Sequence, residues 1–350
     1  MPLVTCVTFV VMNNIRLSIL DQSQLRRNST AAEALRESGE LVQLAEKLGY
    51  TRYWVSEHHN FSMVAGTAPE VLIPWLASKT STIRIGSGGI MLPNHSTLKV
   101  AENFGLLETL FPGRIDLGMG RAPGGDRLSA YLLNPNNHFN EKDFYQQLKS
   151  LRAFLRNEPQ PDANYEKVKA YPISEQMPEL WLLTSSGGSA QFAAHLGLGL
   201  SYAQFINPDS GPDTADFYRH NFKPSAELQQ PKVIVSIFAF CSEDEQKIAA
   251  WKIEFDYRLL HIESGAIGDL PSEQAIRDTH YNLQQRARIA YNEGRYIAGT
   301  PDTLKAEILK ISERYETDEI MIATIAANAE DRNKSYELLA ALFIPEYQPQ

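Results

Sequence analysis

The stretch TIRIGSGGIMLPNHSTLKVAENFGLLETLFPGRIDLGMG (Thr82–Gly120) indicates the fold of this chain. Its two ends, TIRIGSGG and RIDLGMG, are short apolar runs typical of buried strands. Between them, apolar residues recur at helical spacing, at Val100, Phe104, Leu107 and Phe111. Pro112-Gly113 then ends the helix. The stretch therefore predicts a strand, a helix and a second strand in direct succession.

Similar strand and helix patterns alternate along the rest of the chain. We expect eight strands, at residues 15–20, 53–58, 82–89, 114–120, 179–184, 198–203, 231–240 and 319–324. Short strands that are apolar on both faces and separated by helices predict a parallel α/β fold, here a TIM (β/α)8 barrel. A doubly wound open sheet is the alternative, but no typical dinucleotide fingerprint follows the first strand.

Local signals support this division into elements. Thr30 and Glu33 form the Thr-x-x-Glu pattern of a capping box, and Gly49 ends the helix that follows. Residues 121–140 are rich in Gly, Asn and Pro, and residues 260–294 form an irregular segment that contains helix. We expect both to be insertions at the C-terminal face of the barrel, where they line or cover the pocket.

Length and composition fit one globular domain. The chain has 350 residues, 43% of them hydrophobic and 21% charged, which is ordinary for a globular protein. We divide it into an N-terminal extension (1–14) and a single barrel domain (15–345). The apolar start, MPLVTCVTFVVMNN, lacks the basic region of a signal peptide. We expect the residues before Asn13 to be dispensable, because they precede the first strand.

Several classes of function are excluded by composition. A net charge of −9 argues against nucleic-acid binding, which depends on clustered Lys and Arg. No apolar run is long enough to cross a membrane. Cys6 and Cys241 belong to no CxxC pattern, which indicates a reducing compartment, and we expect the cytoplasm. There is no HExxH motif and no cysteine cluster, so no metal site is predicted.

The segment LWLLTSSGGSAQFAAHLG predicts an anion site at the start of a helix. A strand runs into Ser185, Ser186 and Ser189, with Gly187 and Gly188 between them. Free backbone N–H groups and the helix dipole attract an anion there, and the glycines let a phosphate approach the backbone. The alternative is an ordinary helix start with a serine cap.

Two further candidates follow the third and fourth predicted strands. Arg121, in GMGRAPGGD, has a guanidinium group suited to phosphate or carboxylate, although an ion pair with Asp126 or another acid is the better explanation when this motif is taken alone. Gly88 and Gly89, in IGSGGIMLP, leave room for a flat ring at the mouth of the barrel. The alternative for the glycines is a β-bulge or a turn.

The segment WVSEHH ends the second predicted strand in ionisable residues. His58 and His59 are adjacent on an extended segment, so their side chains point to opposite sides and are poorly placed to share a metal. One imidazole, that of His58, can serve the pocket, while Glu57 or His59 supports the loop. A hydrogen-bonded histidine at a strand end remains the alternative for His59.

Taken together, these segments resemble the flavin-dependent bacterial luciferase-like monooxygenases, in the branch close to alkanal monooxygenase. The resemblance is carried, in this order, by LAEKLGYTRYWVSEHHN, IRIGSGGIMLPNHSTLKVAENFGLLETLFPGRIDLGMGRAPGGD, WLLTSSGGSAQFAAHLGL, NFKPS and GTPDTLKAEILKISERYETDEIMI. It spans the chain from about residue 15 to residue 326 and implies a TIM-type barrel.

The resemblance also implies a reaction. Reduced FMN (FMNH2) would be the co-substrate, and its reaction with O2 would form a C4a-peroxyflavin that oxygenates a small organic substrate. His58, the first histidine of the pair, matches the active-site histidine of the family. The peroxide has to be protected from water by the protein.

The resemblance assigns the flavin contacts by motif position. Arg121 and three serines, Ser185, Ser186 and Ser189, would hold the FMN phosphate, and Gly88 and Gly89 fall where relatives often carry a non-prolyl cis peptide beneath the flavin ring. Luciferase itself has Glu-Ser where this chain has Ser185-Ser186. The cysteine that precedes the phosphate arginine in luciferase is Gly120 here, so light emission does not follow from the resemblance.

Partners follow from the same comparison. No Rossmann GxGxxG follows any strand, so a separate NAD(P)H:flavin reductase is expected to supply the reduced flavin. A homodimer is also expected. Two other readings stay open: an FMN- or deazaflavin-dependent reductase or dehydrogenase on the same barrel, and a non-catalytic flavin-binding protein.

Overall fold

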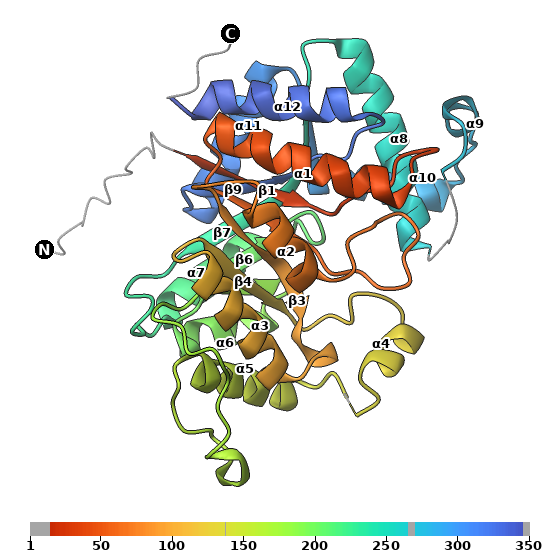
Figure 1. Cartoon of the computed structure of the whole chain (residues 1–350). Coiled ribbons are helices and arrows are strands. Elements are labelled where there is room, and N and C mark those ends of the chain that lie inside the picture. Colours follow the sequence, from red (N-terminus) through yellow and green to blue (C-terminus); the bar gives the residue numbers. More distant parts are fainter. Residues whose placement is uncertain (1–14, 137, 265–269, 346–350) are drawn as a thin grey trace, which may run out of the picture.

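The computed structural model of the chain describes residues 15–136, 138–264 and 270–345. The predicted N-terminal extension (1–14) lies outside these residues, as does the expectation that it is dispensable. Within the described part, strands and helices alternate along the chain in the order expected for a (β/α) fold (Figure 1).

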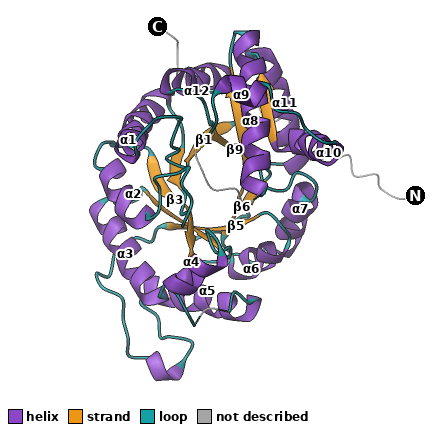
Figure 2. Cartoon of the chain, turned by 90° about the vertical axis from the view of Figure 1, so that its right-hand side faces the viewer, coloured by secondary structure: helices purple, strands orange, loops and turns teal. Residues whose placement is uncertain are grey.

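Eight parallel strands close into a barrel, as predicted (Figure 2). They are β1 (Arg16–Asp21), β2 (Arg52–Val55), β3 (Arg84–Met91), β4 (Ile115–Gly120), β5 (Glu179–Thr184), β6 (Gly199–Ala203), β7 (Val233–Cys241) and β9 (Glu319–Ala323). Each strand pairs in parallel with its neighbours, and the ring closes through the pairs β6–β7, β7–β9 and β9–β1. The open-sheet alternative is therefore wrong.

Helices surround this ring (Figure 2). They are α1 (Ala31–Leu48), α2 (Pro69–Ala77), α3 (Thr97–Leu110), α5 (Glu141–Leu155), α6 (Gly188–Leu196), α7 (Gly211–Asn221), α11 (Pro301–Tyr315) and α12 (Ala329–Phe343). The capping box of α1 is confirmed, since the Glu33 N–H donates to Thr30 Oγ1 at 3.2 Å and the Thr30 N–H donates to Glu33 Oε2 at 2.7 Å. Gly49 ends α1 with a left-handed φ of 83°.

The insertions contain more regular structure than the sequence predicted. Residues 121–140 include the helix α4 (Arg127–Leu133), and the later insertion includes α9 (Glu273–Arg277) and α10 (Leu283–Asn292). A ninth strand follows it, β8 (Tyr296–Gly299), which the sequence analysis missed because four residues carry too little periodicity. β7 extends beyond the barrel. Its end, Phe238–Cys241, pairs with β8 outside the ring.

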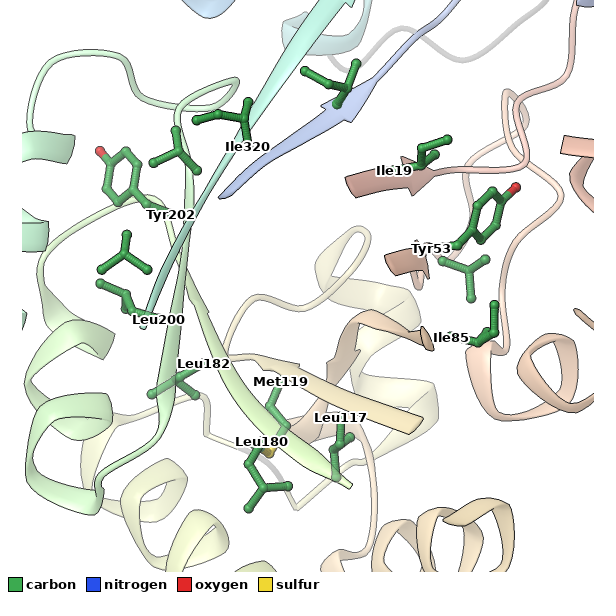
Figure 3. Packing of buried hydrophobic residues seen from close by; sticks show 14 of the residues in the cluster. Ile19, Tyr53, Ile85, Leu117, Met119, Leu180, Leu182, Leu200, Tyr202 and Ile320 are labelled. Atoms are coloured by element: carbon green, nitrogen blue, oxygen red, sulfur yellow. The ribbon is translucent and has the colours of Figure 1, made fainter. Parts of the chain in front are cut away.

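Strand residues alternate between two hydrophobic regions. One set faces outward and packs under the helices; Ile19, Tyr53, Ile85, Leu117, Leu182 and Leu200 are examples (Figure 3). The other set fills the barrel, where the rings of Trp54 and Trp181 meet edge-on with centroids 5.7 Å apart. A Cβ at Gly199 would lie 2.5 Å from the Trp181 ring, so glycine makes the space that this ring fills.

Charged residues close the N-terminal end of the barrel. Arg52, at the start of β2, is 2% exposed, and its guanidinium lies 2.7 Å from Asp116 Oδ2, 2.6 Å from Glu319 Oε1 and 3.3 Å from Glu179 Oε2. The Trp54 indole N–H also donates to Asp116, at 2.8 Å. This network and the tryptophans above it fill the lower part of the barrel.

Candidate active site

A cavity of about 1050 Å³ opens at the C-terminal ends of the barrel strands. This volume is at the upper end of the ~300–1,000 Å³ usual for small-molecule sites. Six of the seven residues singled out in the sequence line it, namely His58, Gly88, Arg121, Ser185, Ser186 and Ser189. The seventh, Gly89, is not among the lining residues. Segments far apart in the chain thus meet at the mouth of one barrel.

The start of α6 forms one corner of the cavity. The helix begins at Gly188, and its N-cap residue, Gly187, makes no side-chain capping bond. The serine cap considered as the alternative to an anion site is therefore absent. The Ser186 backbone N–H donates a hydrogen bond to Thr184 Oγ1 at 3.2 Å. Ser189 is buried in the first turn of α6 and lines the cavity. First-turn N–H groups without a side-chain cap suit an anion.

Arg121 reaches this corner from the end of β4. Its Nη1 lies 2.6 Å from Oε1 of Glu141, the first residue of α5. A Cβ on Gly188 would lie 3.3 Å from the same Glu141 oxygen and 3.7 Å from Arg121 Nη2, so the pair borders the α6 start. The acid that pairs with Arg121 is thus Glu141. Asp126 instead caps α4, with Oδ1 accepting the N–H groups of Leu128 and Ser129.

Gly88 and Gly89 occupy an irregular part of β3. The peptide bond between them is cis, and the register with β4 shifts between Gly88 and Ile90, so the bulge considered from the sequence is present. A Cβ on Gly88 would meet Leu20 Cδ1 at 2.9 Å and Trp54 Cε3 at 3.0 Å. Gly89 is turned to β4, where its Cβ would lie 2.7 Å from the Gly118 oxygen. At Gly88 the cavity is therefore lined by backbone atoms alone, without a side chain.

His58 follows a strand that is shorter than predicted. β2 ends at Val55, so a strand reaching His58 was wrong. Beyond Val55 the chain bonds to loops, with the His58 N–H donating to Gly66 O at 3.3 Å and the His59 N–H to Gly124 O at 2.8 Å. The His58 side chain lines the cavity. Burial lowers the pKa of this imidazole, and a hydrogen bond with the Gly124 backbone offsets part of the effect.

Glu57 is the functional residue that sequence reasoning undervalued. Its carboxylate is 1% exposed and lies 2.8 Å from His59 Nε2 and 3.0 Å from His95 Nε2. The Met91 N–H also donates to it, at 2.8 Å. Burial alone would raise the pKa of Glu57, but hydrogen bonds from these groups hold it below its usual value. The isolated His95 after the third predicted strand was the only available signal of this cluster.

Residues 15–136, 138–264 and 270–345 contain no group of three or more His, Cys, Asp or Glu side chains that could hold a metal ion. Over the same ranges, the helices are too short or too polar to cross a bilayer.

The fold and the site define a TIM-barrel protein with a cavity at the C-terminal ends of its strands, lined by the start of α6, Arg121 and His58. The chain belongs to the luciferase-like monooxygenase family, whose sequence profile matches residues 15–317. The family and the named relatives below indicate a monooxygenase, and hence an oxidoreductase.

Relatives match over nearly their full length. The chain is 43% identical to the uncharacterized protein YwcH of Bacillus subtilis (strain 168), covering 94% of this chain and 99% of that protein. It is 34% identical to the N-acetyl-S-alkylcysteine monooxygenase of the same organism, covering 93% and 97%. Among solved structures, apo-MsnO8 matches with a TM-score of 0.85 and 32% identity, covering 96% of this chain and all of that one.

More distant structures share the fold alone and differ in cofactor. The oxygenating component of 3,6-diketocamphane monooxygenase from Pseudomonas putida, solved with FMN, matches with a TM-score of 0.66 at 16% identity. An F420-dependent secondary alcohol dehydrogenase matches with the same TM-score at 14% identity. The barrel by itself therefore does not select between a flavin and a deazaflavin.

Proposed function

We propose that this chain is a monooxygenase that takes reduced FMN as a co-substrate, together with O2, and oxygenates a small organic molecule. The observation that carries the proposal is that one cavity combines the α6 start and Arg121 with Gly88 and His58. The α6 start and Arg121 fit a phosphate. Gly88 and His58 fit a flat ring beside a proton donor or acceptor. Membership of the luciferase-like monooxygenase family supports the same reading.

The residues present fit FMN. The phosphate would lie against the N–H groups of the first turn of α6, with Ser186, Ser189 and Arg121 as further donors. Ser185 lines the same corner and completes the set. The ring would lie over Gly88, next to Gly89, where a side chain would already be blocked by Leu20 and Trp54. When bound, reduced FMN supplies the activation of O2, and the protein orients and shields it.

His58 is the proposed acid–base residue of the pocket. Because burial lowers its pKa, the imidazole is neutral at pH 7 and can accept a proton from the substrate side of the cavity. Leu20, Met91, Phe205 and Ile206 line the same space with apolar surface, which excludes water from the reacting groups.

The substrate proposal rests on the relatives. The N-acetyl-S-alkylcysteine monooxygenase is named for a sulfur-containing amino-acid derivative and aligns over nearly the whole chain. We therefore place S-alkylcysteine derivatives and other thioethers first among the compounds to be screened. A separate NAD(P)H:flavin reductase, a homodimeric state and a cytoplasmic location complete the proposal.

Product formation with a reductase tests the function. With the pure protein, FMN, NADH and an unrelated flavin reductase, the thioether pool should give an oxygenated product that incorporates ¹⁸O from ¹⁸O2, at a rate far above that of the same mixture without the protein. NADH oxidation without the reductase should stay at the background rate.

The two alternative functions predict different results from flavin-binding and turnover measurements. Tight binding of reduced F420 with none of reduced FMN would favour the deazaflavin reductase or dehydrogenase. Flavin binding without substrate turnover across the screened pool would favour a non-catalytic flavin-binding protein.

A further inference from the structure

We propose that Glu57 is a positioning residue whose carboxylate fixes His58 by joining the three loops that surround the cavity floor. The inference rests on the proposed function in one respect only, that His58 is the acid–base residue. Glu57 itself is assigned no proton transfer to the substrate.

The carboxylate has an unusually complete set of donors. Oε2 accepts the Met91 N–H at 2.8 Å, and Oε1 lies 2.8 Å from His59 Nε2. His95 Nε2 is 3.0 Å from one oxygen and 3.1 Å from the other, and Asn94 Nδ2 lies 3.5 Å from Oε1. An ionised carboxylate offers about four acceptor positions, so these donors fill it. A buried carboxylate that accepts this many hydrogen bonds is held in one orientation.

These contacts connect separate parts of the barrel mouth. Glu57 and His59 follow β2, whereas Met91 ends β3, and His95 and Asn94 follow it. The loop after β4 joins through two further bonds, since the Asn94 amide donates to Pro123 O at 2.9 Å and the His59 N–H donates to Gly124 O at 2.8 Å. The loops after β2, β3 and β4, of which the first carries His58 and the third Arg121, are thus bonded to one another around Glu57.

His58 is held between its own neighbours. The side chains of Glu57 and His59 bond to each other, and the backbone N–H groups of His58 and His59 are both taken by loop carbonyls. The backbone at His58 is therefore fixed on both sides. Loss of the Glu57 carboxylate would release His59, His95 and the Met91 N–H together, and the His58 ring would lose its defined direction.

Several charged and titratable groups surround Glu57. His58, His59 and His95 face it, and Glu70 acts electrostatically on His95. The Glu57 charge raises the pKa of both His58 and His95. Removing that charge should therefore lower the pKa of each imidazole, whereas the loss of a residue that served only the stability of the fold, away from His58, would leave the His58 pKa unchanged.

The experiment compares Glu57→Gln with Glu108→Gln. Glu108 is an equally buried carboxylate, bonded to the Gly113 N–H at 2.5 Å outside the cavity, and controls for the cost of a buried amide. Histidine NMR titrations of the flavin-free proteins, assigned with His58→Ala, give the pKa of His58. Binding of reduced FMN and product formed per O2 consumed are measured on the same samples.

We expect Glu57→Gln to lower the His58 pKa and to cut product per O2 by roughly tenfold or more, which is part of the ~10²–10⁴-fold that positioned proton transfer contributes. Glu57→Asp, which keeps the charge, should restore part of the His58 pKa. An unchanged His58 titration in Glu57→Gln, or equal losses of product in Glu57→Gln and Glu108→Gln, would overturn the proposal. If Glu57→Gln does not fold, Glu57→Asp, whose shorter side chain moves the charge away from its partners, should still shift the His58 pKa and lower product per O2, and no change in either quantity would overturn the proposal. Since the titration needs no flavin, failure of the monooxygenase proposal is seen separately.

Discussion

Arg121 Nη1 lies 2.6 Å from Glu141 Oε1, directly beside the first residue of α6. The proposed phosphate site thus already contains a carboxylate. Because the Glu141 side chain is 63% exposed and the Arg121 side chain 28% exposed, the pair is a weak surface interaction rather than a buried one. A bound phosphate would compete with Glu141 for the same guanidinium.

Arg121→Ala should weaken the binding of FMN by about 1.5–3 kcal/mol, the usual value of a hydrogen bond to a charged group. Titration of the reduced and oxidised flavins by fluorescence or calorimetry measures this loss. Riboflavin, which lacks the phosphate, should bind the parent and the variant with equal affinity. Equal losses for FMN and riboflavin would place Arg121 outside the phosphate corner.

Glu141→Gln should have the opposite effect on FMN affinity. Removing the competing charge while keeping an acceptor for Arg121 should strengthen FMN binding by ~0.3–1 kcal/mol, the scale of an exposed pair. The gain should shrink at high salt, because exposed charges are screened. A weaker affinity for FMN in Glu141→Gln would show that Glu141 orients Arg121 rather than competing for it.

Gly88→Ala should damage the cavity floor. The new Cβ would lie 2.9 Å from Leu20 Cδ1 and 3.0 Å from Trp54 Cε3, and overpacking of this kind costs ~1–3 kcal/mol. Thermal unfolding should show a lower Tm, and flavin affinity should fall as well. Gly187→Ala is the matched control for the Tm alone, since its Cβ would meet nothing nearer than Thr214 Oγ1 at 3.9 Å, whereas its position at the proposed phosphate corner excludes it as a control for flavin affinity. Similar losses of Tm in both variants would contradict the prediction.

His58→Ala should uncouple oxygen consumption from product formation. Flavin affinity should stay nearly unchanged, while product per O2 falls and free hydrogen peroxide rises, because positioned proton transfer contributes ~10²–10⁴-fold. His59→Ala should act mainly on stability, since its ring lies on Glu57 and not among the cavity-lining residues. A larger product loss at His59 than at His58 would refute this assignment.

The pKa of His58 also predicts how stability depends on pH. Burial holds the folded-state pKa below 6.5, so the unfolded chain binds a proton at a higher pH than the folded chain does. His58 therefore makes the protein less stable as the pH falls through the unfolded-state value. His58→Ala should reduce the loss of unfolding free energy between about pH 7 and 5. A steeper loss in the variant would show that the His58 pKa is raised.

Arg52→Met should be the most destabilising of these changes. It would leave Asp116, Glu319 and Glu179 without their shared cation inside the barrel, and breaking a buried pair costs ~3–5 kcal/mol. Urea unfolding gives the free energy. Arg277→Met removes an exposed pair with Glu273 and should cost under ~1 kcal/mol. Equal costs would mean that the barrel network is solvated.

The sequence by itself determined the barrel and most of its elements. Short apolar strands and local signals, such as the capping box at Thr30 and the left-handed Gly49, depend on neighbouring residues and can be read directly. Arg121 and the serines follow the ends of predicted strands. The sequence therefore places them at the C-terminal face, because the parallel strands of a barrel all end on the same side.

Only the tertiary structure decided which side chains face one another. No local signal links Arg121 to Glu141, which is 20 residues away, or Glu57 to His95, which is 38 residues away. Likewise, a four-residue strand such as β8 exists because the overhanging end of β7 offers it unpaired backbone groups. Contacts of this kind depend on the closure of the whole barrel, which brings distant loops to one rim and is not encoded in the periodicity of any single segment.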